Sequence, residues 1–455
     1  MAVVSSFVLN FGKIIASLFI RIKIIDNTFM LKHIQNLKGI SILLILLAFG
    51  CKSNSQETAE EKSKPKVNMP AKVIDETQVS WKTDINAALE EARNRGELLF
   101  VECYSPTCQY CIAIEPYFKE PQVAKMYNTN FINYKLNVQE ADQVKFLNDK
   151  NIWLPSFPMF LYFDGDGNLV HQASADPSIA SLNGNAEAAL DVKTRASSYA
   201  GRFADGERSV KFLSDYASFT RVIKDTLAGL AASDALFEIY PKNKLGSEES
   251  WGLTKKAVSD IDNGFAKYWL SHTGQAAAYE NKEGHPDNQD NILGGILQSS
   301  LYSPRGQKYN LEQLQTVRKH MTAIKAGKFA DNVLWEFEAK AYMREDKLPE
   351  ALALGNKMIT AFKGNGSAFV YITRVFNDNF PDNSHVSMAK NWLKDALPTI
   401  TQDNVKSEYY YEMARLNQKA GELAEAKKNA AAAKELSFKV NTKLTKFDDL
   451  VESLN

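Results

Sequence analysis

The sequence predicts an α/β domain at residues 80–202, followed by an all-α domain at residues 203–455. Within the first region, a C-x-x-C pair lies between an apolar strand and a helix, and a short polar turn further on separates two more strands. From residue 203 onward, long segments contain few glycines and prolines, which is typical of helices. The length of 455 residues leaves room for both parts.

The segments before residue 80 predict export and anchoring. Residues 30–51 contain a short positive region, an apolar stretch and a small residue before Cys51, as signal peptides do. This ending resembles the bacterial lipobox, in which the cysteine carries the lipid. The expectation is a periplasm-facing lipoprotein of the bacterial cell envelope, bound to a membrane through lipid on Cys51. A retained membrane anchor is the alternative, but the apolar stretch is short for one.

The residues around that signal have simpler interpretations. An ordinary signal peptide would start at Met30, so residues 1–29 are interpreted as a non-native N-terminal extension, with a weak membrane segment as the alternative. The polar residues 52–79 are typical of a flexible tether.

Cys108 and Cys111 have the spacing of a redox-active dithiol. The first cysteine opens a helix, where unpaired N–H groups favour its thiolate, and the second lies one turn along the same face. Half of a zinc site is the competing interpretation, but it needs two more cysteine or histidine ligands at short spacing, and the sequence has none there. We therefore predict redox chemistry without a metal, with a structural or vestigial disulfide as the remaining alternative.

The surrounding residues resemble the thioredoxin fold family over about residues 80–202. Glu102 stands where that family has a buried carboxylate that exchanges protons with the resolving thiol. Pro116 matches the proline at the bend of the active-site helix, and Pro158 matches the cis-proline that faces the thiols. The resemblance implies a central mixed sheet flanked by helices and no cofactor. It implies catalytic roles for four residues: Cys108, Cys111, Glu102 and Pro158.

Within that family, the sequence is most similar to exported thioredoxin-like domains, which include the C-terminal domain of the transmembrane disulfide reductase. Trp81 precedes an amphipathic helix, and Pro121-Gln122-Val123 and Asn130-Phe131 follow the active-site helix, as in that group. Gln109-Tyr110 between the cysteines and bulky Phe157 before the proline depart from the usual pattern. These departures leave reductase, isomerase and oxidase open.

Other residues near the cysteine pair are predicted to contact substrate, to pack in the core or to form a turn. Tyr104 and Trp153 flank the pair and are expected either to contact substrate or to pack in the core. Cys103 points to the opposite face of the strand and is predicted to be a small buried group. The run 164–168 lacks the later residues of a calcium loop and predicts a tight hairpin turn. The predicted substrate-binding residues are Tyr104, Gln109, Tyr110, Trp153 and Phe157.

The C-terminal region predicts helical hairpins. The runs with the clearest helical pattern are 213–232, 332–342, 348–362, 388–397 and 407–436. Residues 339–351 align with residues 414–426, and each copy predicts a helix, a short polar turn and a second helix. This pattern weakly resembles tetratricopeptide hairpins, and an irregular helical bundle is the alternative.

Composition limits the classes of partner. The 54 basic and 54 acidic residues balance, so no excess of charge favours nucleic acid. The sequence therefore predicts a thiol:disulfide oxidoreductase of the envelope, leaning to protein-disulfide reductase. Its expected partners are protein thiols and disulfides, and an upstream thiol:disulfide electron donor or acceptor. The alternative is a non-catalytic binding scaffold with a degenerate thioredoxin fold.

Overall fold

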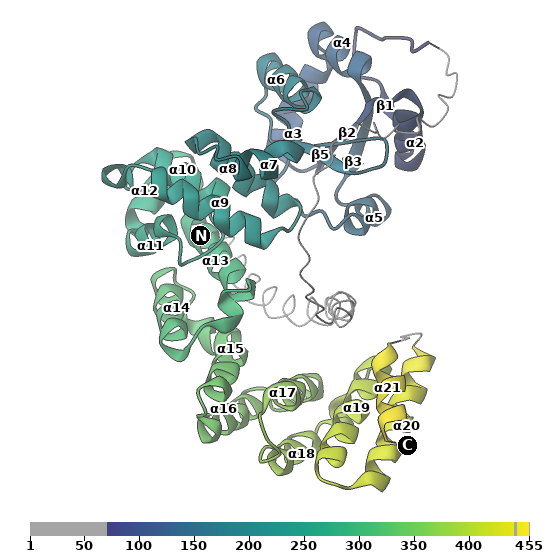
Figure 1. Ribbon diagram of the computed structural model, residues 1–455, viewed down its shortest axis with the longest axis vertical. Coiled ribbons are helices and arrows are strands. Elements are labelled where there is room, and N and C mark those ends of the chain that lie inside the picture. Colours follow the sequence, from purple (N-terminus) through teal and green to yellow (C-terminus); the bar gives the residue numbers. More distant parts are fainter. Residues whose placement is uncertain (1–70, 441–443, 455) are drawn as a thin grey trace, which may run out of the picture. The chain divides into compact units, whose positions relative to one another are not determined.

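The computed structural model describes residues 71–440 and 444–454 (Figure 1). They form two compact units, one ending at Pro304 and the other beginning at Arg305. The predicted signal peptide, the lipid-bearing Cys51 and the N-terminal extension lie outside the described residues. Just before the sheet, Val79 is buried and its N–H donates to the carbonyl of Phe118, so the end of the predicted tether packs on the first unit.

The first unit is built on a mixed five-stranded sheet in the order β1-β3-β2-β4-β5. β2 is parallel to β3 and antiparallel to β4, and β4 forms a hairpin with β5. The predicted turn between β4 and β5 is present, where the side chain of Asp164 accepts the N–H groups of Asp166 and Asn168. The strands are β1 (Trp81–Lys82), β2 (Leu98–Tyr104), β3 (Phe131–Asn137), β4 (Met159–Phe163) and β5 (Leu169–Ala173).

Helices cover both faces of the sheet. On one face, α2 and α5 pack against alternate residues of β2, including Val101 and Cys103. On the other face, α4 and α6 pack around Phe100, so Glu102 points to this second face. The helices are α2 (Ile85–Arg95), α3 (Gln109–Ile114), α4 (Pro121–Asn130), α5 (Ala141–Asp149) and α6 (Ile179–Leu190).

Further helices complete the first unit. The predicted helical run 213–232 is not one helix: Lys224 has a φ of 56°, and the side chain of Asp225 caps a new helix by accepting the N–H of Ala228. Sequence inspection missed this break because neither glycine nor proline marks it. These helices are α7 (Tyr199–Ala204), α8 (Val210–Val222), α9 (Thr226–Ile239), α10 (Glu248–Ala257), α11 (Gly264–Ser271), α12 (Thr273–Lys282) and α13 (Asn288–Tyr302).

All the regular secondary structure described in the second unit is helical, and the two aligned copies are both helical hairpins. α15 packs on α16, and α19 packs on α20. Asp346 and Gly421 occupy equivalent places in the two turns and have φ angles of 56° and 79°. The helices are α14 (Leu311–Ala323), α15 (Ala330–Arg344), α16 (Leu348–Ala361), α17 (Gly366–Asn379), α18 (Val386–Lys394), α19 (Asp403–Lys419), α20 (Leu423–Lys439) and α21 (Thr445–Ser453).

Candidate active site

The two cysteines lie where β2 leads into α3. Cys108 is the N-cap residue of α3, and its Sγ accepts the backbone N–H of Cys111 at 3.2 Å. A hydrogen bond donated to the sulfur stabilises negative charge on it. Both residues are free thiols, with Cys108 half-buried and Cys111 buried. The first cysteine is therefore the one that a substrate can reach.

The environment of Cys111 keeps it protonated. Burial, and then the neighbouring Cys108, raise the pKa of its thiol to about 12. A thiol with this pKa carries its proton at neutral pH and is a poor nucleophile until a base removes that proton. The two cysteines thus differ in the way that a nucleophile and a resolving thiol must differ.

Glu102 is the candidate for that base. Its side chain is 1% exposed, and burial raises the pKa of the carboxyl to about 7 against the opposing effect of Lys135. Glu102 and Cys111 line the same cavity of about 400 Å³, which is open to solvent. A carboxyl that titrates near neutral pH can both accept and return a proton there.

Lys135, which sequence inspection missed, pairs with the buried carboxyl of Glu102. It faces Glu102 across the β2–β3 ladder, with its Nζ 3.5 Å from Oε2 of Glu102, and it also pairs with Glu115. The ammonium lies over the rings of Trp81 and Tyr104. Only the pairing of the two strands reveals this contact, because the two residues lie far apart in the chain.

Two prolines lie where the resemblance places them. The Phe157–Pro158 peptide bond is cis, which confirms the prediction. Cys108 Sγ lies 3.6 Å from the carbonyl oxygen of Phe157, so the loop before Pro158 faces the half-buried thiol. Pro116 lies in a 3₁₀ helix, Glu115–Lys119, that follows directly on α3, where the active-site helix changes its course.

Comparison with family models agrees with this geometry. Residues 80–165 match a family described as thioredoxin-like. This part of the chain is a thioredoxin-like domain. A comparison with curated proteins gives no match. The domain brings together the four residues predicted to be catalytic, and a helical region follows it, as the sequence predicted.

Most of the predicted substrate-binding residues of the thioredoxin-like domain are exposed. The side chains of Tyr110, Trp153 and Phe157 are 60%, 45% and 37% exposed, and Gln109 is also exposed. Tyr104 is only partly buried, and its ring contacts the ammonium of Lys135. Sequence inspection missed Ile112, which follows Cys111 and is 52% exposed. Exposed apolar side chains therefore lie close in the chain to the two cysteines and to the cis-proline.

The third cysteine of the thioredoxin-like domain takes no part in this arrangement. Cys103 is fully buried on the face that α2 and α5 cover, opposite Glu102. Burial raises the pKa of its thiol far above the usual range. This placement confirms the prediction of a small buried group.

One cluster elsewhere in the first unit has the residue types of a metal site. Ligand atoms of Glu280, Glu283 and His285 lie within 4.8 Å of one another. The ammonium of Lys255, however, lies 2.9 Å from a carboxylate oxygen of each glutamate, and Glu280 also accepts from the indole of Trp251. Lys255 already supplies the positive charge that these carboxylates need, so the cluster is explained without a metal.

No helix between residues 71 and 440, or between 444 and 454, combines the length and the apolar character needed to cross a bilayer.

Proposed function

We propose that this chain is a protein thiol:disulfide oxidoreductase that works in the reducing direction. The observation that carries the dithiol chemistry is the asymmetry of the two cysteines, and the reducing direction is the part that the redox titration below tests. The accessible sulfur of Cys108 accepts a helix N–H and faces the cis-proline loop, while Cys111 is buried and protonated beside Glu102. Attack needs an accessible thiolate, and resolution needs a second thiol that is deprotonated only when it reacts, so this arrangement suits both steps.

The reaction begins with Cys108. Its thiolate attacks one sulfur of a substrate disulfide, so the substrate S–S bond breaks, a Cys108–substrate disulfide forms and the first substrate thiolate leaves. Cys111 then gives its proton to the Glu102 carboxylate and attacks Sγ of Cys108. This step forms the Cys108–Cys111 disulfide and releases the second substrate thiolate. Two electrons pass from the dithiol to the substrate, and an upstream dithiol donor must return them.

Substrate binding follows from the exposed surface. The loop before Pro158 offers backbone groups to an extended chain, and Tyr110, Trp153 and Phe157 offer apolar contacts. We place the protein in the bacterial cell envelope, held to a membrane by lipid on Cys51, because of the signal-peptide pattern of residues 30–51.

Three cysteine variants test the chemistry. Cys108→Ser should lose turnover of protein disulfides, whereas Cys111→Ser should accumulate substrate trapped on Cys108, visible by mass spectrometry of the intact protein. Cys103→Ala is the matched control, because this thiol is fully buried on the opposite face, and it should retain turnover. Full turnover of Cys108→Ser would refute the proposal.

A titration in redox buffers tests the direction. A reduction potential near about −270 mV for the Cys108–Cys111 pair would support a reductant, and a value near about −120 to −180 mV would indicate an oxidant or isomerase. The alternative is a binding scaffold, and the one observation that favours it is the exposed apolar side chains. Absence of any reversible two-electron couple would support that scaffold.

A further inference from the structure

The loop that carries Trp153 is joined to the helical part of the first unit. Trp153 lies five residues before the cis-proline, and its backbone N–H donates to the carbonyl of Val222, at the end of α8, at 2.9 Å. The side chain of Val222 is fully buried in the cluster that includes Leu147 and Ile152 of the thioredoxin-like domain. The end of α8 is thus part of the core that supports this loop.

Arg221 makes a second connection to the same loop. Its guanidinium lies 5.5 Å from the centre of the Trp153 ring, within the range of a cation–π contact. One of its nitrogens, Nη1, donates to the carbonyls of Lys255 and Lys256, which lie in the last turn of α10. Arg221 therefore links α8, the end of α10 and the indole. No carboxylate pairs with it within the described residues, so its charge is available to the ring.

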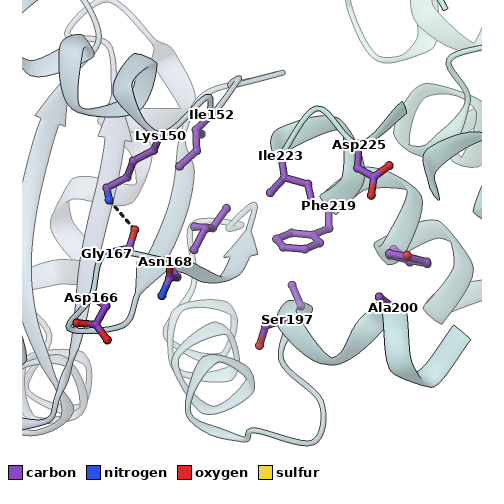
Figure 2. A pocket seen from close by; sticks show the side chains of 13 residues that line it. Lys150, Ile152, Asp166, Gly167, Asn168, Ser197, Ala200, Phe219, Ile223 and Asp225 are labelled. Carbon is purple, nitrogen blue, oxygen red and sulfur yellow. Dashed lines mark hydrogen bonds between the residues drawn. The ribbon is translucent and has the colours of Figure 1, made fainter. Parts of the chain in front are cut away.

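A cavity lies next to these two connections. It has a volume of about 500 Å³ and lies beside the loop, between Ile152 of the thioredoxin-like domain and Phe219 and Ile223 of the helical part (Figure 2). Ile152, directly before Trp153, lines this cavity and also packs in the buried cluster that contains Val222. Trp153 therefore lies at the junction of the thioredoxin-like domain and α8, where it contacts residues 221 and 222.

We propose that α8 and the end of α10 form part of the substrate-binding site. Val222 holds the backbone of Trp153 and Arg221 holds its ring, so that the exposed indole is a fixed platform for an apolar side chain of the substrate polypeptide. Arg221 is a positioning residue, because it acts through Trp153. This inference rests on the proposed function. It extends that function by naming the substrate class, polypeptides with an apolar side chain beside the disulfide.

Two synthetic peptides test the proposal. Each has one internal disulfide, with leucine beside the cysteine in one peptide and serine in the other. In the full-length protein, Arg221→Ala should raise KM for the leucine peptide about fivefold, equivalent to the loss of about 1 kcal/mol of binding free energy. The value of kcat should stay unchanged. KM for the serine peptide should change less than about twofold. Arg221→Lys, which keeps the cation, should restore most of the binding.

Arg208→Ala is the matched control. Arg208 also lies over a ring, that of Phe203, and also donates to backbone carbonyls, but it makes no contact with Trp153 in the described structure. It should leave both KM values unchanged. An equal rise of KM for the two peptides with Arg221→Ala, or the same effect from Arg208→Ala, would refute the platform.

Amide hydrogen exchange separates this inference from the proposed function. Arg221→Ala should speed exchange at the N–H of Trp153, which the wild-type chain protects through Val222. This readout needs no turnover. Absence of turnover in the wild type would refute the oxidoreductase, whereas unchanged exchange at Trp153 would refute the positioning role of Arg221.

Discussion

The ammonium of Lys135 lies 3.5 Å from the carboxyl of Glu102, directly across the β2–β3 ladder. Burial raises the pKa of Glu102, while the ammonium opposes the rise, and the pKa is about 7. The pair therefore places a proton acceptor with a pKa of about 7 in the cavity that the buried Cys111 also lines. Five predictions rest on this pair and on other named contacts.

Glu102→Gln should slow the resolving step. In the wild type, the rate of Cys111 attack should rise with pH through about 7, because the Glu102 carboxylate takes the thiol proton. The variant should lose this rise and react about 100-fold more slowly. Stopped-flow measurement of mixed-disulfide decay between pH 5 and pH 9 provides the check. A variant that keeps the inflection near pH 7 would refute the assignment.

The same substitution should change the pH dependence of stability. The folded-state pKa of Glu102 lies above the unfolded value of about 4.3, so its protonated form stabilises the fold, and this contribution is lost as pH rises from about 4.3 to 7. Glu102→Gln should remove that loss. At pH 8 it should be the more stable protein, by on the order of 3 kcal/mol in urea unfolding. Equal stability of the two proteins at pH 5 and pH 8 would contradict this.

Lys135→Met should move the inflection of the rate to higher pH. Because the ammonium favours the ionised carboxyl, its removal should raise the pKa of Glu102 by about one unit. Lys119→Met is a suitable control, since Lys119 lines the same cavity but makes no ion pair with Glu102 in the described structure. The measurement is the pH profile of mixed-disulfide decay, and an unmoved inflection in Lys135→Met would argue against the charge pair.

The two hairpin turns of the second unit should respond oppositely to matched substitutions. Asp346 has a left-handed φ of 56°, so Asp346→Gly should stabilise the unit by about 0.5 kcal/mol. Gly421 has a φ of 79° and open space around the position of a Cβ, so Gly421→Ala should cost about 1 kcal/mol through backbone strain alone. Thermal unfolding of the two variants would show this. Shifts of the same sign would contradict the equivalence of the turns.

Glu280→Ala should destabilise the helical part of the first unit. Its buried carboxylate accepts from the Trp251 indole and pairs with Lys255, so its loss leaves the buried indole N–H without its acceptor and Lys255 with Glu283 as its remaining partner. The expected cost is about 3 kcal/mol by urea unfolding. Hydrogen bonds lower the pKa of this carboxyl despite its burial, so its contribution is present above pH 4.3 and is lost as pH falls below that value. Glu248→Ala, which removes an exposed ion pair with Lys282, is the control and should cost less than about 1 kcal/mol.

Local residues were sufficient to predict much of this protein. The C-x-x-C pair, the acidic residue on the preceding strand and Pro158 predicted a thioredoxin-like domain, and the described fold and the cis peptide bond confirm that part. The scarcity of glycine and proline predicted the helical region, and the alignment of residues 339–351 with 414–426 predicted its two hairpins. These features depend on neighbours close in the chain, where residue type and spacing act directly.

Tertiary structure decided the rest. The contact of Lys135 with Glu102 depends on strand order and register, and the contact of Arg221 with Trp153 depends on how α8 packs against the sheet. Both join residues far apart in sequence, whose proximity is set by burial of a shared core and not by local preference. The break of the helix at Lys224 has the same origin, because Val222 is fixed in that core while Asp225 starts a helix in a new direction.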